Sequence, residues 1–397
     1  MRNLFSTAAV SVLLAAATLA TQIPPGFAAS PVRGVTDTEI VIGTYTDLSG
    51  VTAVWGVNNN NAWRLAFEEA NAKGGINGRK IKFITEDNQY QIPRSIQAAN
   101  KLINMDGVFM MVGNDGTPMN NAVMPDQLEK GVPNMFPLTA ARSMYDPYNK
   151  LKFGQFASYY DQMRAGVKYF VEQKGKKALC AMYQDTDFGR DIMNGVWDQT
   201  KAMGIKLVAE TTHKPTDADF SASVAKLHDA NCDLVLIGTI VRDTNQIVAA
   251  IRKTGWNVDI MGQSAIYDSA VAEVPGGITE GVYAMTPSLF ANPDDPRPAV
   301  QAFVKKYKAA YDKDPNFAAE VGWTAAQMVL LGLQNAGRDL NVDSFVAGME
   351  KVHDYKDIFG SPEYSFGPGQ HHGSSKAFLV QVKGGRWTSV LPAAIGY

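Results

Sequence analysis

The stretch VFMMVGNDGTPMNNAVMP, residues 108–125, connects an apolar run to a helical pattern through a turn that contains two glycines. Residues 108–112 predict a buried strand, because a short apolar run before turn residues is typical of a parallel sheet. Gly113 and Gly116 permit tight or positive-φ turns, and Thr117 followed by proline suits an N-cap and a first helical turn. The stretch therefore predicts a strand, a turn and a helix in direct succession.

The same alternation extends outward from this unit in both directions. In the first part of the chain the pattern predicts strands at 39–45, 80–87, 108–112 and 132–136, and helices at 61–74, 93–104 and 118–129. Strands separated by helices imply a parallel sheet with right-handed crossovers.

The alternation restarts near residue 158. It predicts helices at 160–173, 188–203, 219–229 and 243–254, and strands at 177–183, 205–210, 233–238 and 258–262. The remaining third predicts a strand at 281–287, helices at 298–312, 317–336 and 342–352, and a closing strand at 376–385. We therefore predict an α/β fold with two doubly wound halves, to which the last third adds helices and an edge strand. Because the chain would cross between the halves more than once, a hinge is favoured over a flexible linker.

The first 29 residues resemble an export signal, with Arg2, an apolar core and small residues before a cleavage point at Ala28 or Ala29. Removing them leaves about 368 residues, enough for two domains, and a formal charge of −3. No later segment has 18 apolar residues, so we expect a soluble mature protein with no membrane insertion. The absence of a basic cluster argues against nucleic acid as a partner.

Cys180 and Cys232 are the only cysteines, and both adjoin apolar runs. We expect two buried thiols rather than a disulfide. No zinc-ligand spacing occurs, and the pair His371 and His372 lies in a turn rich in glycine and proline, which favours a surface loop over a metal site. Since no G-x-S-x-G, G-x-G-x-x-G, P-loop or H-E-x-x-H motif occurs, we expect neither an enzyme nor a cofactor.

Ligands of an open parallel sheet bind beyond the carboxyl ends of its strands, where the turn at 113–117 lies. The free N–H groups and the dipole of the following helix favour an anion. Without the P-loop lysine, a carboxylate suits this turn better than a phosphate. Residues 138–140 follow the next strand and are expected in the same crevice, facing the strand exits at 183–189, 238–244 and 262–268 of the other half.

Six short motifs occur together along the chain. They are LSG and WG within 48–56, NAKGGINGRKI at 71–81, VGNDGT at 112–117, GVPNMFP at 131–137, DTDFGRD at 185–191, and F.A.V..L at 220–227. In order and spacing the chain resembles, over residues 38–385, the solute-binding proteins of the leucine/isoleucine/valine-binding family, which serve ATP-driven (ABC) importers.

The resemblance implies two Rossmann-like lobes joined by a three-segment hinge, with the ligand enclosed in the cleft between them. The hinge segments would fall near 152–157, 281–287 and 359–367. The first lobe would comprise 38–154 and 285–360, and the second lobe 155–284 and 361–397. It also implies a membrane permease as partner, and we expect a monomer.

The resemblance also assigns the ligand site. Thr117 would hold a ligand carboxylate together with Leu138, Thr139 and Ala140, next to Asp115 and Gly116 in the same turn. In amino-acid-binding members an acidic residue of the second lobe pairs with the ligand ammonium, but the matching position here is Ser264. A buried ammonium without a counter-charge costs several kcal/mol. Asp187, Asp243 or Asp268 could take that role, which keeps an amino-acid ligand open.

The aromatic residue at the matching position of the first lobe is Trp55, and its counterpart in the second lobe is Phe188. The two would sandwich a flat apolar body, and Arg242 could give a second grip on a carboxylate or a ring substituent. We therefore expect a periplasmic solute-binding protein of a Gram-negative bacterium that captures a small organic acid, with an aromatic carboxylate favoured. A branched-chain amino acid is the alternative ligand, and a doubly wound enzyme or a ligand sensor is the alternative from other classes.

Overall fold

The computed structural model describes residues 1, 31–292 and 294–397, and residues 32–397 form the compact unit considered below. The predicted export signal at 1–29 lies, apart from Met1, outside the described residues. Among the described residues no helix has the length and apolar character needed to cross a membrane.

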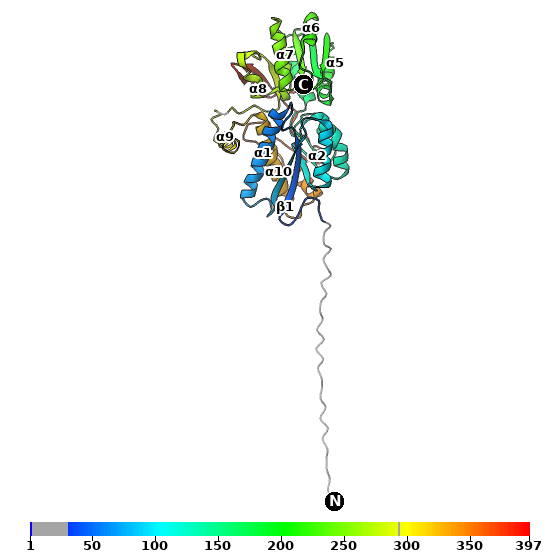
Figure 1. Cartoon of the computed structure of the whole chain (residues 1–397), viewed down its shortest axis with the longest axis vertical. Helices are drawn as coiled ribbons and strands as arrows, with labels where there is room; N and C mark the ends of the chain where they lie inside the picture. The colour runs from blue at the N-terminus through cyan, green and yellow to red at the C-terminus, as the bar shows by residue number, and fades with distance from the viewer. Residues whose placement is uncertain (2–30, 293) are drawn as a thin grey trace. The chain divides into compact units, whose positions relative to one another are not determined.

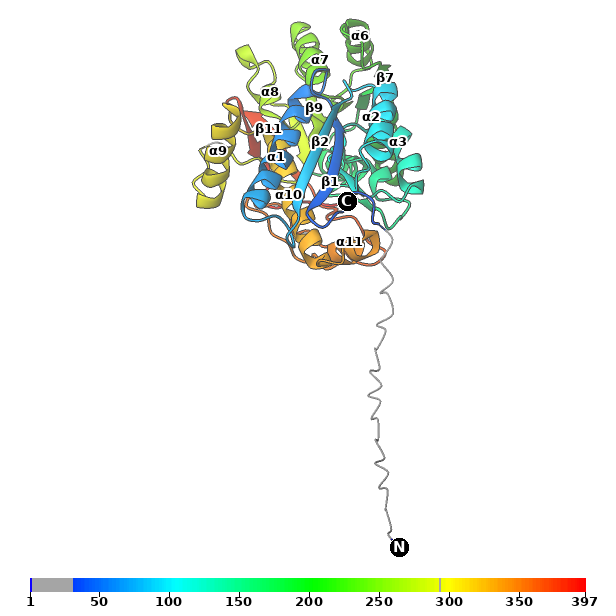
Figure 2. The same cartoon turned by 60° about the horizontal axis from the view of Figure 1, so that its bottom comes forward.

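The first lobe is built on a five-stranded sheet in the order β2-β1-β3-β4-β5, in which all neighbours are parallel. The strands are β1 (Glu39–Thr46), β2 (Lys80–Asp87), β3 (Met110–Val112), β4 (Asn134–Met135) and β5 (Lys152–Phe153). The connecting helices are α1 (Ala53–Ala72), α2 (Ile92–Asn104) and α3 (Thr117–Glu129). Figure 2 shows α1 and α10 on one side of β1, and α2 and α3 on the other. The predicted parallel sheet is confirmed, although β4 is shorter than the predicted strand at 132–136.

Helix α1 begins at Ala53, eight residues before the predicted helix at 61–74. Four consecutive asparagines at 58–61 interrupt the apolar periodicity of its first turns, so the pattern did not predict a helix there. In the structure these amides make helix contacts: Asn58 donates to the carbonyl of Val54, and Asn59 accepts from the indole of Trp63.

The second lobe is built on a seven-stranded sheet in the order β12-β11-β10-β9-β8-β6-β7. Its strands are β6 (Leu179–Gln184), β7 (Ala209–His213), β8 (Leu234–Gly238), β9 (Asp259–Gly262), β10 (Tyr283–Thr286), β11 (Phe378–Lys383) and β12 (Arg386–Ser389). Strands β6 to β10 run parallel, and β11 and β12 add an antiparallel hairpin at the edge. The helices are α4 (Tyr159–Glu172), α5 (Asp187–Ala202), α6 (Ser221–Asp229), α7 (Val241–Lys253) and α8 (Ser269–Ala272).

The predicted strand at 205–210 is wrong in position, because β7 spans Ala209–His213. The ladder with β6 starts at Ala209, opposite Cys180, and continues to His213. The apolar residues within 205–208 suggested a strand that starts too early in the sequence. In the structure Val208 is exposed, and its N–H donates to the carbonyl of Leu179 just before the ladder begins.

The last third of the chain divides between the lobes as predicted. Helices α9 (Pro298–Tyr311), α10 (Phe317–Ala336) and α11 (Val342–Met349) join the first lobe, because α9 and α10 pack on α1 and α11 packs on α10. The chain passes between the lobes after β5, after β10 and before β11, and a bridge between Gly154 and His372 places the first and third passages side by side. Figure 1 shows α1, α2 and α10 around β1, with α5 to α8 grouped in the other lobe. The two-lobed α/β architecture is confirmed, while the lobe boundaries stay a prediction.

The expectation of two free thiols is wrong. Cys180 and Cys232 form a disulfide with a Cα–Cα distance of 5.8 Å and a sequence separation of 52. Cys180 lies on β6 and Cys232 lies two residues before β8, and the sheet order places β8 directly beside β6. Their burial, by contrast, is as expected, since Cys180 is 0% exposed and Cys232 is 5% exposed.

Candidate functional site

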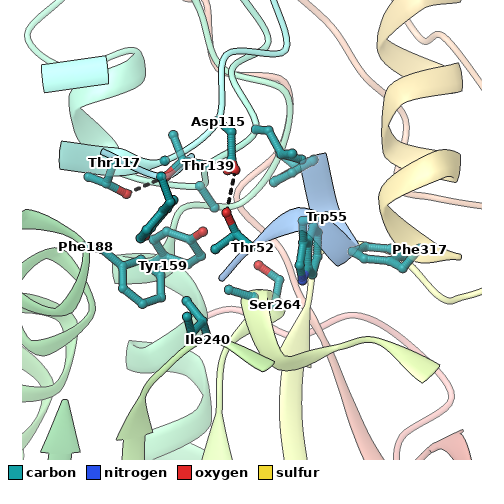
Figure 3. A pocket seen from close by; sticks show the side chains of 16 residues that line it. Thr52, Trp55, Asp115, Thr117, Thr139, Tyr159, Phe188, Ile240, Ser264 and Phe317 are labelled. Carbon is teal, nitrogen blue, oxygen red and sulfur yellow. Dashed lines mark hydrogen bonds between the residues drawn. The ribbon is translucent and has the colours of Figure 1, made fainter. Parts of the chain in front are cut away.

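A pocket lies between the two lobes, at the carboxyl ends of strands from both sheets (Figure 3). The non-atom space inside it is about 530 Å³, which includes space open to solvent. Its lining comprises Thr52, Trp55, Tyr90, Asp115, Gly116, Thr117, Leu138, Thr139, Ala140, Phe156, Tyr159, Phe188, Ile240, Ser264, Ala265 and Phe317. Most of these side chains are apolar or aromatic, with a few hydroxyls and one carboxyl.

The glycine-rich turn after β3 shapes one end of the pocket. Gly116 has a φ of +88° and is the residue that precedes the first turn of α3. A Cβ at Gly116 would lie 2.9 Å from side-chain atoms of Met119 and Tyr90, so the turn needs glycine for both conformation and space. Thr117, predicted as the N-cap, is instead the first helical residue, which turns its hydroxyl towards the pocket (Figure 3).

A cluster of hydroxyl groups lies beside the start of α3. The Oγ1 atoms of Thr117 and Thr139 are 2.6 Å apart, and both side chains are buried. Burial raises the pKa of Tyr159 to about 12, opposed by hydrogen bonding to the backbone of Ala140 and to Thr139. The phenol therefore keeps its proton at neutral pH. We name Thr117, Thr139 and Tyr159 the hydroxyl cluster; it can donate hydrogen bonds to an anion.

A second polar group comes from the start of α1. Thr52 Oγ1 lies 2.8 Å from Asp115 Oδ2 and also 2.8 Å from Asp47 Oδ2. Burial, and secondarily the nearby charge of Asp47, raises the pKa of Asp115 to about 7, while the hydrogen bond from Thr52 opposes this rise. Burial also raises the pKa of the neighbouring Tyr45 and Tyr90 well above the usual value.

Aromatic side chains form the walls. Trp55 and Phe188 stand on opposite sides of the pocket (Figure 3). Phe317 contacts Trp55 edge-on with ring centroids 5.8 Å apart, and Tyr159 contacts Phe188 edge-on at 5.2 Å. These contacts restrict both walls, since aromatic pairs of this geometry are worth about 0.5–1.5 kcal/mol each. The indole nitrogen of Trp55 is buried and has no hydrogen-bond partner among the described residues.

The structure brings nine of the eleven predicted site residues to this pocket. They are Trp55, Asp115, Gly116, Thr117, Leu138, Thr139, Ala140, Phe188 and Ser264. The other two do not line it. Asp187 is exposed at the start of α5, where it accepts a hydrogen bond from Asn121 of α3. Arg242 points away, because its guanidinium donates to the carbonyls of Pro215 and Asp217 and pairs with Asp243.

The acids considered as substitutes for Ser264 are also committed elsewhere. Asp243 is fully buried between Arg242 and His213. Asp268 caps α8 by accepting from the N–H of Ala270, and it also accepts from Asn316. Asp115 is therefore the only acidic residue among the lining residues of the described chain. The described residues of the chain also contain no group of three or more His, Cys, Asp or Glu side chains that could hold a metal ion.

Seven lining residues were not named as site residues in the sequence analysis. They are Thr52, Tyr90, Phe156, Tyr159, Ile240, Ala265 and Phe317. Thr52 was missed with the true start of α1, whereas Tyr90 follows strand β2 and the strand-end rule could have found it. Ile240 and Ala265 lie within the strand exits 238–244 and 262–268, which the sequence analysis expected to face the crevice. Phe317 comes from a helix in the last third of the chain, and no local signal connects it to the site.

Comparison with known proteins places this geometry in a family. A family model described as "Periplasmic binding protein" matches residues 39–386. The leucine-specific-binding protein of Salmonella typhimurium is 24% identical over 284 residues, which cover 72% of this chain and 75% of that protein.

Solved structures agree in fold. The fatty acid ABC transporter substrate-binding protein from Thermomonospora curvata matches with a TM-score of 0.82 and 23% identity, over 92% of this chain and 94% of that one. A substrate-binding periplasmic protein from Ralstonia solanacearum matches with a TM-score of 0.77 and 25% identity, over 87% and 97% of the two chains. The chain therefore belongs to the periplasmic binding protein family, and it is a non-enzymatic solute-binding protein with that family's two-lobed α/β fold.

Proposed function

We propose that this protein captures a small apolar carboxylic acid between its lobes, with an aromatic carboxylate as the favoured ligand, and delivers it to an ABC importer. The observation that carries the proposal is the hydroxyl cluster set between the aromatic walls of Trp55 and Phe188. A flat apolar body would fill the space between the walls while its carboxylate met the hydroxyls.

The relatives support the breadth of this ligand class. The Salmonella protein is named for leucine and the Thermomonospora protein for fatty acids, and both ligands carry one carboxylate on an apolar body. Delivery to an ABC transporter is supported by the name of the Thermomonospora protein. Location in the periplasm rests on the family and on the export-like residues 1–29. We also propose that it acts as a monomer with one permease partner.

A carboxylate can be accommodated without a cation. One proton lies in the contact between the Thr117 and Thr139 hydroxyls, so this pair offers one free donor and the phenol of Tyr159 offers another. The first turn of α3 adds its backbone N–H groups and the positive end of its dipole. Hydrogen bonds to charged groups are worth about 1.5–3 kcal/mol each, enough to offset much of the desolvation of one carboxylate. No Lys, Arg or His lines the pocket in the described part of the chain.

A branched-chain amino acid is the second candidate, and Asp115 is the observation that favours it. An ammonium group needs a counter-charge when it is buried. Ser264 cannot supply one, and its backbone N–H is already bonded to Gln162 at 2.8 Å. Among the lining residues of the described chain, Asp115 alone could pair with an ammonium, and it lies on the opposite lobe from the position that the family resemblance assigns to the acid.

Titration calorimetry of protein that has been unfolded, washed and refolded decides between these ligands. We expect benzoate or octanoate to bind with a Kd in the micromolar range, and leucine to bind at least about 100-fold more weakly, about 2.7 kcal/mol. Tight binding of leucine with no detectable binding of either acid would overturn the proposal.

Replacing Thr139 with valine should weaken benzoate binding by about 10- to 50-fold, or about 1.4–2.3 kcal/mol, because a charge-assisted hydrogen bond is lost at constant side-chain shape. Calorimetry measures this change. Thr38→Val, an exposed change of the same chemistry in the same lobe, is the control and should leave the Kd within about twofold. Equal effects of the two substitutions would contradict a carboxylate grip at Thr139.

Arg142 links the two lobes at the rim. It follows the residues 138–140 that line the pocket, lies 3.6 Å from Asp191 of α5, and stacks with its guanidinium carbon 3.8 Å above the ring of Tyr160. Burial raises the pKa of Asp191 to about 6, and the Arg142 charge opposes that rise. The ion pair and the stacking contact therefore join α5 and α4 of the second lobe to the segment after residue 140.

Replacing Arg142 with alanine should raise the dissociation rate of the bound acid by about 5- to 20-fold, because a cation–π contact and an ion pair are worth about 1–2 kcal/mol together. Stopped-flow tryptophan fluorescence measures the rate. Arg190→Ala is the matched control, because it removes a more exposed pair between Arg190 of α5 and Asp185, which precedes that helix. An unchanged dissociation rate in the Arg142 variant would show that the contacts of Arg142 with Asp191 and Tyr160 do not slow release of the ligand.

A further inference from the structure

The two contacts of Thr52 need more than one proton. Its Oγ1 lies 2.8 Å from a carboxyl oxygen of Asp47 and 2.8 Å from one of Asp115. A hydroxyl donates one hydrogen bond and accepts through its lone pairs. If both acids were ionised, one of these close oxygen–oxygen contacts would contain no hydrogen. Two separate two-centre hydrogen bonds at these distances therefore need a proton on one of the two acids.

Asp47 is fixed as the acceptor. Its two carboxyl oxygens accept the backbone N–H groups of Ser49, Gly50 and Thr52, and such groups can only donate. A carboxylate that accepts two or three N–H bonds is stabilised in its charged form. Asp115 also has the backbone N–H groups of Asp47 and Gly116 nearby, which lower its pKa, but burial outweighs them. The hydroxyl of Thr52 accordingly donates to Asp47, and the proton of the second contact lies on Asp115.

The groups around Asp115 favour the same assignment. The titratable side chains that face it are Asp47 of the β1–α1 turn, Tyr45 of β1, Tyr90 after β2 and Tyr159 of α4. None of them is a cation. Asp115 is only 4% exposed and has no ion-pair partner among the described residues. Burial raises its pKa to about 7, so the neutral form is substantially populated at neutral pH.

We propose that Asp115 acts in ligand binding as a neutral carboxylic acid, bonded through Thr52 to the anionic Asp47, and that its proton makes the pocket select carboxylates over amino acids. This inference rests on the proposed function. The chain of hydrogen bonds runs from Asp115 Oδ2 through Thr52 Oγ1 to Asp47 Oδ2. With Asp115 neutral, the pocket neither repels a ligand carboxylate nor offers a counter-charge to an ammonium.

The sign of the pH dependence follows directly. Asp115 ionises as the pH rises through about 7, which places a negative charge beside the ligand carboxylate and leaves two acceptors for one Thr52 proton. Affinity for a monocarboxylate should therefore be constant below the pKa of Asp115 and should fall about tenfold per pH unit above it. The fall should end at the pH where the ligand binds mainly to protein with an ionised Asp115.

The test measures binding of benzoate and of octanoate by calorimetry at about pH 6 and about pH 9. Wild-type protein should lose about 30- to 100-fold in affinity between these values, whereas Asp115→Asn, a neutral isostere, should change less than about threefold. At the higher pH the Asn variant should bind more tightly than wild type. Asp126→Asn, an exposed acid of α3 in the same lobe, is the control and should keep the wild-type pH profile. A flat wild-type profile, or a steep profile in the Asn variant, would overturn the proposal.

A second measurement separates this inference from the choice of ligand. In ligand-free protein labelled with ¹³C at aspartate carboxyl carbons, the resonance that disappears in Asp115→Asn should titrate near pH 7. Titration near the usual value of about 4 would contradict a neutral Asp115 even if neither acid binds. If the resonance titrates near pH 7 but neither acid binds, only the proposed function fails. Leucine binding that is lost in Asp115→Asn would identify Asp115 as an ammonium partner and would also overturn the inference.

Discussion

Replacing both Cys180 and Cys232 with alanine should lower the free energy of unfolding by about 4 kcal/mol. The disulfide closes a loop with a sequence separation of 52, which spans α5, β7 and α6 between two adjacent strands of the second sheet. Without the bond the unfolded chain regains the entropy of that loop. The loss is a large part of the stability of a typical domain, which is about 5–15 kcal/mol.

Urea unfolding followed by tryptophan fluorescence measures this effect, with reduced wild-type protein as a second route to the same state. The reduced protein and the double variant should agree within about 1 kcal/mol, because both lack the cross-link while alanine adds only a small cavity. A thiol assay on denatured, unreduced wild-type protein is the control and should detect no free thiol. Two free thiols, or a loss below about 1 kcal/mol, would contradict a stabilising disulfide.

Replacing Arg242 with methionine should lower the free energy of unfolding by about 3 kcal/mol and leave the Kd for benzoate within about twofold. Its guanidinium pairs with Asp243, whose side chain is 0% exposed, and it also donates to two backbone carbonyls. Removing it leaves a buried carboxylate with His213 as its remaining partner. Breaking one partner of a buried pair costs more than the pair itself contributes.

This result would show that Arg242 stabilises the fold and does not bind the ligand, contrary to the role that the sequence analysis predicted for it. Arg190→Met is the matched control in the same lobe, because its pair with Asp185 is exposed at 61% and 52% and should contribute less than about 1 kcal/mol. Urea unfolding and calorimetry of the same two variants give both quantities. A drop in affinity of more than about tenfold with stability unchanged would restore Arg242 to the binding site.

The pocket combines features that favour one ligand class in different ways. Under the proposed function, the hydroxyl cluster would give the carboxylate its donors, the walls of Trp55 and Phe188 would give the apolar body its contacts, and Asp115 would decide the charge that the ligand can carry. The first two are independent of pH in the neutral range, whereas the third is not. A pH profile therefore distinguishes the contribution of Asp115 from those of the walls and hydroxyls.

Most of the fold was determined by the sequence itself. The alternation of apolar runs and amphipathic helices requires parallel sheets with helices on both faces, and it predicted the two lobes because each strand and helix buries its own apolar side. The strand-end rule then placed Thr117, Leu138 and Thr139 at the pocket, since the carboxyl ends of parallel strands share one edge.

Only the tertiary structure decided the pairings between distant residues. Cys180 meets Cys232 because β8 lies next to β6 and not next to β7, an order that spacing along the chain does not show. Arg242 has a strand-end position yet turns away from the pocket, because Asp243 and two carbonyls satisfy its donors. Asp115 was placed in the site by its sequence position, but its protonation depends on where the Thr52 hydroxyl and the N–H groups around Asp47 point. Hydrogen-bond direction and burial are properties of the packed chain, and local sequence patterns carry neither.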